Sequence, residues 1–179
     1  MSIDIESCMV RKSNIYYPLA AVWLIADFLT KRWVFGYLTE HGGSQQIFGD
    51  YLRLTLALNR GMAFGFSFGE WSRLILICFV LITIALIYHL YRQTSDSETT
   101  QAVALGLITG GALGNLVDRL TSARGVVDFI DVGIGTHRFW LFNVADAGVS
   151  IGGALLVLTL WTASNRHKEM DGQRENPQT

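Results

Sequence analysis

The 179-residue sequence contains little charge, little proline and little cysteine. Charged residues make up 16% of the chain, and the whole sequence has two prolines and two cysteines. Cys8 and Cys78 lie far apart, which excludes a disulfide scaffold and gives no zinc-binding pattern. A net charge of −1 without a basic cluster gives no indication of nucleic-acid binding. Because 50% of the residues are hydrophobic, intrinsic disorder of the whole chain is also excluded.

Several catalytic and cofactor-binding motifs are absent as well. The sequence has no G-x-x-x-x-G-K-[ST] or G-x-G-x-x-G element, so nucleotide-driven and dinucleotide chemistry have no support. The four histidines are scattered, without H-E-x-x-H, which gives no support for zinc or haem ligation. One G-x-S-x-G pattern surrounds Ser150, but it lies inside an apolar helical segment. We interpret it as helix packing, because a nucleophilic serine of this type needs a strand–turn–helix elbow.

Four long hydrophobic runs are the main positive feature. A transmembrane helix needs about 20 mostly apolar residues, and the runs predict an all-α polytopic membrane protein with four transmembrane helices. In the third run, Gly106, Gly110 and Gly114 are spaced for the close approach of another helix. The predicted membrane domain is residues 14–164, with spans at 15–38, 74–91, 102–120 and 145–163.

The two long connections between these spans have strand-like patterns. An even number of spans places both termini on one side, so connections 39–73 and 121–143 lie together on the other side. Alternating apolar residues predict strands there, and we expect the strands to pair into one small sheet, or cradle, at that membrane face. The predicted strands are residues 51–58, 64–68, 126–132 and 137–142, with a hairpin turn at 59–61.

The two terminal segments are predicted to lack a fixed structure, and the positive charges do not agree on one membrane orientation. Residues 1–13 are polar and predicted to be mobile, and residues 165–179 are predicted to be a disordered, solvated tail. Of the 14 Lys and Arg residues, six lie on the side of the termini and eight on the other. A raw positive-inside count would therefore place the termini outside.

Several ionisable residues fall at predicted membrane depth, where a charge is costly and often functional. Asp27 and Lys31 are four residues apart on one helix face, and a structural ion pair is the simpler interpretation. Asn115, Asp118 and Arg119 project together at the end of the third run. We expect Asp118 to accept from Arg119 in a satisfied polar network that fixes the end of this helix.

Two other aspartates lack an obvious local cation. Asp128 lies in an apolar run, and Asp146 follows the candidate N-cap Asn143 in the first turn of the fourth span. A lone aspartate there usually interacts with the helix dipole. If the two carboxylates meet in a partly dehydrated site, however, one keeps a proton while the other ionises, which is the division of roles in aspartic proteases. The residues alone also leave open a small transporter or proton-conducting subunit, and a structural assembly protein.

Five motifs follow one another along residues 19–163. They are Asp27-x-x-Thr30-Lys31, Asn59-Arg60-Gly61-Met62-Ala63-Phe64, residues 111–119, Val126-Val127-Asp128-Phe129 and Phe142-Asn143-Val144-Ala145-Asp146. In this order they resemble the motifs of the lipoprotein signal peptidase (signal peptidase II) family. The resemblance implies an aspartic endopeptidase that removes the signal peptide from diacylglyceryl-modified prolipoproteins, just before the lipidated cysteine. It implies no metal, nucleotide or organic cofactor.

The resemblance also implies roles for residues and a location. It places the enzyme in the bacterial inner membrane, with cytoplasmic termini and an active site near the outer leaflet, against the raw charge count. It implies inhibition by globomycin, contact with membrane lipid and a lid-like loop or half-helix bearing Phe64, Phe66, Phe68 and Trp71. A monomer is the simplest expectation. The implied roles are a catalytic dyad of Asp128 and Asp146, substrate-binding or supporting Asn59, Asn115, Arg119 and Asn143, and structural polar Asp27, Lys31 and Asp118.

Overall fold

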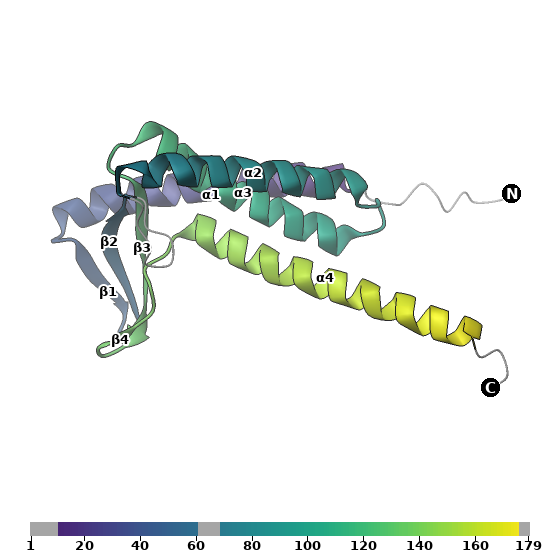
Figure 1. Ribbon diagram of the computed structural model, residues 1–179. Helices are drawn as coiled ribbons and strands as arrows, with labels where there is room; N and C mark the ends of the chain where they lie inside the picture. Colours follow the sequence, from purple (N-terminus) through teal and green to yellow (C-terminus); the bar gives the residue numbers. More distant parts are fainter. Residues whose placement is uncertain (1–10, 61–68, 176–179) are drawn as a thin grey trace, which may run out of the picture.

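The structure, a computed structural model, describes residues 11–60 and 69–175. Four helices make up most of it, and Figure 1 shows α1, α2 and α3 running side by side while α4 diverges toward its C-terminal end. In the apolar window of α3, 67% of the residues are buried, against 11% in α2 and 17% in α4, so α3 is the central helix. The helices are α1 (Ser13–Glu40), α2 (Ser72–Gln93), α3 (Thr99–Thr121) and α4 (Val144–Glu175).

Three of the described helices are long and apolar enough to cross a membrane: α2, α3 and the Val144–Asn165 part of α4. The first predicted span coincides with α1, which is long enough but not apolar enough to be counted with these three helices. Its charged residues Asp27, Lys31 and Arg32 lower the mean hydropathy of that helix. The helical character of all four runs is confirmed, whereas a membrane-spanning α1 stays a prediction.

A four-stranded antiparallel sheet lies at the end of the bundle where α1 ends and α4 begins (Figure 1). Its order is β1-β2-β3-β4, and the central pair β2–β3 joins the two long connections. The predicted pairing of these connections into one sheet is therefore confirmed. The strands are β1 (Ser44–Phe48), β2 (Leu52–Asn59), β3 (Val126–Ile134) and β4 (His137–Arg138).

The sheet is held to the bundle by an apolar cluster beneath β3. Val34 and Leu38, on the last turns of α1, are buried against Phe129 of β3. Burial of such side chains stabilises a contact by about 1.5–3 kcal/mol each. The contact fixes β3 relative to the helices, so the side chains at the start of β3 have a defined position beside α3 and α4.

Several sequence predictions need correction or stay untested. The sequence patterns do not predict β1, and β4 covers only the first two residues of the strand predicted at 137–142, where Phe142 instead forms an isolated bridge with Ile130. The polar residues from Asn165, predicted to be disordered, continue α4 to Glu175. The predicted strand at 64–68, its lid phenylalanines and the last residue of the 59–61 turn lie outside the described residues. Trp71 ends a short helix, η2 (Gly69–Trp71), and is exposed.

Glycines on two sides of α3 allow α1 and α4 to approach it closely. A Cβ on Gly110 would lie 2.7 Å from the backbone oxygen of Ala20 in α1. A Cβ on Gly114 would meet the carboxylate of Asp27, and one on Gly111 would meet the backbone oxygen of Ala145 in α4. The predicted small-residue packing is therefore present, and it brings polar groups of three helices together.

The substitution Gly111→Ala tests this close contact. Because the obstructing atom belongs to the backbone of α4, the new methyl group must displace the start of that helix, and we expect a loss of about 1–3 kcal/mol of stability. Gly153→Ala is the matched control, since a Cβ added there would have no neighbouring atom within 4 Å. Thermal unfolding in detergent compares the two variants. Equal midpoints would show that the α3–α4 contact tolerates a methyl group.

Candidate active site

The two singled-out aspartates come from different elements and meet at the junction of sheet and bundle. Asp128 lies near the start of β3, opposite Ala57 of β2, and is 7% exposed. Asp146 lies in the first turn of α4. Between them lies Asn143, which is fully buried. Since β3 is pinned by Phe129 and α4 by the glycines of α3, the backbone fixes the relative position of the two carboxylates.

Asn143 binds both carboxylates. Its side-chain Nδ2 donates to Oδ1 of Asp128 at 2.7 Å, and its backbone N–H donates to Oδ2 of Asp146 at 3.1 Å. In return, the backbone N–H of Asp146 donates to Oδ1 of Asn143 at 2.9 Å. The last two bonds form a reciprocal N-cap of α4, as in a capping box. One residue therefore caps the helix and links the two acidic side chains.

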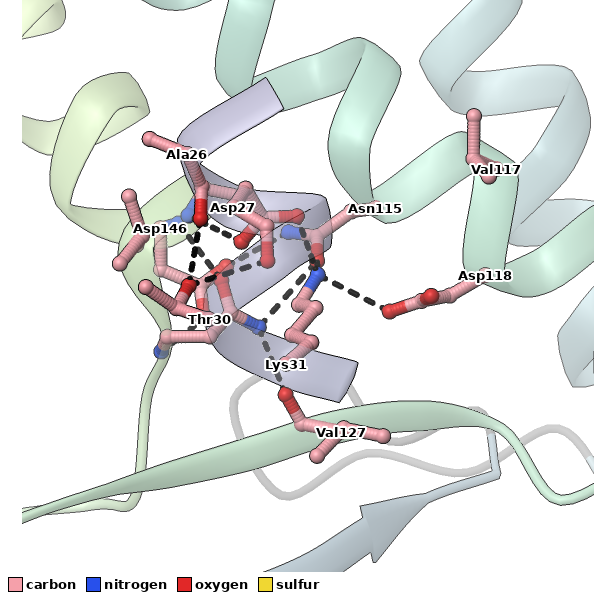
Figure 2. Close-up of polar contacts among 12 residues, drawn as sticks. Ala26, Asp27, Thr30, Lys31, Asn115, Val117, Asp118, Val127 and Asp146 are labelled. Atoms are coloured by element: carbon pink, nitrogen blue, oxygen red, sulfur yellow. Dashed lines mark hydrogen bonds and ion pairs between the residues drawn. The ribbon is translucent and has the colours of Figure 1, made fainter. Parts of the chain in front are cut away.

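Asn115 of α3 provides the second contact to Asp146. Its Nδ2 donates to Oδ1 of Asp146 at 2.8 Å. Its Oδ1 accepts from Nδ2 of Asn143 at 3.2 Å and from Nζ of Lys31 at 2.9 Å. Figure 2 shows Asn115 between Lys31 and Asp146. Each oxygen of Asp146 thus accepts a hydrogen bond from a fixed N–H group.

Lys31 is the centre of a buried ionic cluster behind these residues. Its Nζ lies 2.8 Å from Oδ2 of Asp27 and 2.9 Å from Oδ2 of Asp118 (Figure 2). The side chains of Lys31 and Asp27 are 3% and 0% exposed. Oδ1 of Asp27 also accepts from the backbone N–H of Ala145 at 2.8 Å. The i, i+4 pair of α1 therefore extends to α3 and to the first turn of α4.

The predicted hydrogen bond from Arg119 to Asp118 is replaced by an ion pair between Asp118 and Lys31, although the charge of Asp118 still attracts Arg119. Adjacent positions on a helix diverge by about 100°, whereas Lys31 of α1 directly faces Asp118. The guanidinium of Arg119 instead donates to the backbone oxygen of Asn115 at 3.1 Å, and it is attracted electrostatically by Asp146 and Asp128. Arg119 is thus oriented toward the aspartate pair.

Burial and charge change the acidity of Asp128. Burial is the largest influence and the charge of Asp146 the second, and together they raise the pKa of Asp128 to about 6. Hydrogen bonds from Asn143 and Asn59, and the charge of Lys31, oppose this rise. Asn59, at the end of β2, thereby contacts the pair from the sheet side. A carboxyl group of this acidity can bind or release a proton near neutral pH.

The raised pKa of Asp128 predicts a pH-dependent stability. Because 6 lies above the ordinary value of 3.8, the folded protein binds this proton more tightly than the unfolded chain. This contribution to stability is complete below pH 3.8 and is lost as the pH rises through about 6, by up to about 3 kcal/mol. Asp128→Asn keeps a neutral side chain at every pH and should lack that loss. Denaturant unfolding in detergent across this pH range measures it, and identical pH dependence of the two proteins would contradict the shift.

Trp23 contributes to the site, although no sequence pattern singled it out. Its indole Nε1 donates to the backbone oxygen of Val144 at 2.8 Å, at the first residue of α4. Gly148 leaves room for this ring, because a Cβ there would meet the indole. Gly152 similarly leaves room for the backbone of Ala104. The glycines of the G-x-S-x-G pattern are thus packing positions, as predicted, and Ser150 is exposed.

Metal ligation has no obvious place among the described residues. Their His, Cys, Asp and Glu side chains form no group of three that could hold a metal ion. The ion pairs at the outer part of the sheet link Asp50 with Arg53, and Asp131 with Arg138. Each carboxylate there forms a direct ion pair, whereas none is found for Asp128 or Asp146 among the residues that the structure describes.

Fold and site together define a helical membrane protein with an ordered carboxylate site at one end of its helices, an architecture suited to an enzyme. Residues 19–162 match the signal peptidase (SPase) II family. The chain belongs to this family, and it is a peptidase of the signal peptidase II type that processes lipoproteins.

Individual relatives agree with this assignment. The chain is 41% identical over 154 residues to the lipoprotein signal peptidase of Caulobacter vibrioides, covering 84% of this chain and 88% of that protein. It is 38% identical to the lipoprotein signal peptidase of Anoxybacillus flavithermus, covering 89% and 93%. Two solved structures, described as bacterial membrane enzymes obtained by the in meso method, align with TM-scores of 0.72 and 0.68 at 27% and 28% identity. They cover 86% and 82% of this chain, and 91% and 92% of theirs.

Proposed function

We propose that the protein is an intramembrane aspartic endopeptidase that cleaves the signal peptide from diacylglyceryl-modified prolipoproteins, just N-terminal to the lipidated cysteine. The observation that carries the proposal is the linkage of two carboxylates through one buried residue, Asn143, with Asp128 itself buried. Two carboxylates in one dehydrated site divide into an ionised and a protonated member. That division supplies both a base and an acid.

The reaction follows from the two protonation states. The ionised aspartate takes a proton from a water molecule while the water oxygen attacks the scissile carbonyl carbon. The protonated aspartate donates its proton to the carbonyl oxygen, which becomes a hydroxyl group of a tetrahedral intermediate. When the C–N bond breaks, the first aspartate gives its proton to the leaving amine of the cysteine and the second recovers its own from the hydroxyl group. No acyl-enzyme forms, and no metal or organic cofactor enters a step.

The roles of the neighbouring residues follow from their contacts. Asn143 and Asn115 hold the dyad, and Asn59 contacts Asp128 from the sheet. Arg119, attracted by both carboxylates, is positioned to bind a backbone carbonyl of the substrate near the cleaved bond. Lys31, with its partners Asp27 and Asp118, joins the helices behind the dyad.

The topology that we propose has four membrane spans, with α1 as the additional one. This helix has 28 residues, which is about 42 Å at 1.5 Å per residue and exceeds the hydrocarbon thickness of about 30 Å. Its buried charges Asp27 and Lys31 neutralise each other inside the bundle and do not face lipid. Hydropathy therefore understates the ability of α1 to cross a membrane.

We further place the protein in the bacterial inner membrane with cytoplasmic termini and the sheet at the outer leaflet. The raw charge count opposes this orientation, but Lys31, Arg53 and Arg138 on the sheet side are engaged in ion pairs. These three cations therefore have structural partners in the fold, and the orientation that we propose rests on membership of the family. At the outer leaflet the diacylglyceryl group of the substrate stays in the bilayer while its peptide bond reaches the dyad.

Cleavage of a purified diacylglyceryl-modified prolipoprotein tests the proposal. In detergent we expect one cut, located by mass spectrometry immediately before the lipidated cysteine, with a much slower reaction on the unmodified precursor. Globomycin should inhibit it, and the protein should work as a monomer with lipid present and without added metal. Failure to cleave under conditions in which the Caulobacter vibrioides relative works, or a cut at another bond, would overturn it.

A further inference from the structure

The ammonium group of Lys31 is surrounded by three side-chain oxygens, two in ion pairs and one in a hydrogen bond. A lysine ammonium has three N–H donors and no acceptor. Nζ of Lys31 lies 2.8 Å from Asp27, 2.9 Å from Asp118 and 2.9 Å from Oδ1 of Asn115. Two negative charges and one neutral amide therefore surround it. The two carboxylates already neutralise the ammonium, so the contact with the amide of Asn115 is not needed for charge balance.

The contact with Lys31 determines which way the amide of Asn115 faces. With Oδ1 toward the ammonium, Nδ2 must lie on the other side, where it donates to Asp146 at 2.8 Å. A flipped amide would place an N–H group against an ammonium, donor against donor, and an oxygen against the carboxylate of Asp146. Both contacts would be repulsive in a buried site. The second bond to Oδ1, from Asn143 at 3.2 Å, favours the same orientation.

We infer that Lys31 is a positioning residue that, by orienting Asn115, keeps Asp146 as the ionised base of the dyad and leaves the shared proton on Asp128. The inference rests on the proposed function and goes beyond it, because it assigns the two roles. Asp146 accepts N–H bonds on both oxygens, from Asn115 and from the backbone of Asn143, and such bonds stabilise a carboxylate.

The surroundings of Asp128 favour its protonated form, in contrast to those of Asp146. It is 7% exposed and lies among apolar residues of β3, including Phe129 and the partly buried Val127. The side chains of Asn143 and Asn59 donate to it. The charged groups facing the dyad are Arg119, Lys31 and, behind Lys31, Asp27 and Asp118, which balance the lysine. The raised pKa of Asp128 agrees with its role as the proton-bearing member.

A double-mutant cycle tests the role of Lys31. We expect Lys31→Met and Asn115→Leu each to lower kcat about 100-fold with little change in KM, because the base is misoriented after substrate has bound. If Lys31 acts through Asn115, the double variant is no more than about threefold slower than the slower single variant. Multiplied effects would overturn the inference. Lys12→Met, at the opposite end of α1, is the matched control for loss of a cation.

Two further measurements separate the role of Lys31 from effects on folding and from the cleavage assay. Thermal unfolding in the same detergent verifies that each variant is folded, so a loss of kcat reports on the site and not on the amount of folded enzyme. Infrared spectroscopy of the uncleaved enzyme near pH 5 should show a protonated carboxyl band that disappears in Asp128→Asn and persists in Asp146→Asn. The reverse pattern would overturn the assignment of the proton. If the wild type does not cleave prolipoprotein at all, the proposed function fails, whatever the infrared result.

Discussion

Asp128→Asn and Asp146→Asn are each expected to lower the turnover of lipidated prolipoprotein by at least about 10³-fold. An aspartate that transfers a proton in the transition state contributes about 10²–10⁴-fold, and an amide cannot replace it as acid or base. Asparagine keeps the size of the side chain and one acceptor oxygen, so the bonds from Asn143 need not be lost. The loss should therefore appear in kcat, whereas folding is retained.

The matched control for this prediction is Ser150→Ala. Ser150 is exposed on α4, one turn beyond Asp146, so the variant should keep wild-type turnover. Cleavage is followed by mass spectrometry at saturating substrate, and thermal unfolding in the same detergent verifies the fold of each protein. Near-normal turnover in either aspartate variant would remove that residue from the mechanism. Loss of activity in Ser150→Ala would instead favour a serine nucleophile.

Asn143→Leu is expected to lower kcat about 100-fold and to destabilise the fold as well. This substitution removes the donor to Asp128 and the cap of α4 while Asp128 stays buried. A displacement of about 1 Å between catalytic groups is enough for a loss of this size. Loss of the N-cap adds about 1 kcal/mol of destabilisation.

Asn143→Ser separates the two tasks of this residue. Serine is a good N-cap, but its shorter side chain does not reach the carboxylate of Asp128. We therefore expect Asn143→Ser to be more stable than Asn143→Leu while losing activity to a similar extent. Kinetics and chemical unfolding, measured on the same preparations, give both quantities. Wild-type turnover in Asn143→Ser would mean that the bridge between the aspartates has no catalytic importance.

Much of the fold could be predicted from the sequence because local patterns determine it. Hydrophobic runs predict the four helices, and alternation predicts β2 and β3. β1 could not be predicted because its sequence, Ser-Gln-Gln-Ile-Phe, is mostly polar and exposed and has no apolar alternation. The strand forms through its pairing with β2. The C-terminal end of α4 could not be predicted because its polar composition is typical of a disordered tail. A helix that has already formed can nevertheless extend into such a segment, because extending a helix costs less than starting one.

The site could be predicted only where the contacts are local. The i, i+4 spacing of Asp27 and Lys31 predicts their ion pair, and the position of Asn143 three residues before Asp146 predicts the cap of α4. The bonds of Lys31 to Asn115 and Asp118 join separate helices, and no spacing along the chain encodes them. They depend on how closely α1 and α3 pack, which the glycines of α3 permit.

The central claim, that Asp128 and Asp146 act as one unit, is tested most directly by the double variant Asp128→Asn/Asp146→Asn. Its residual cleavage is measured beside the two single variants over long incubations by mass spectrometry. Residues that act together lose their joint contribution when either is removed. We therefore predict that the double variant cleaves within about threefold of the slower single variant. A double variant whose loss equals the product of the two single losses would contradict a shared mechanism.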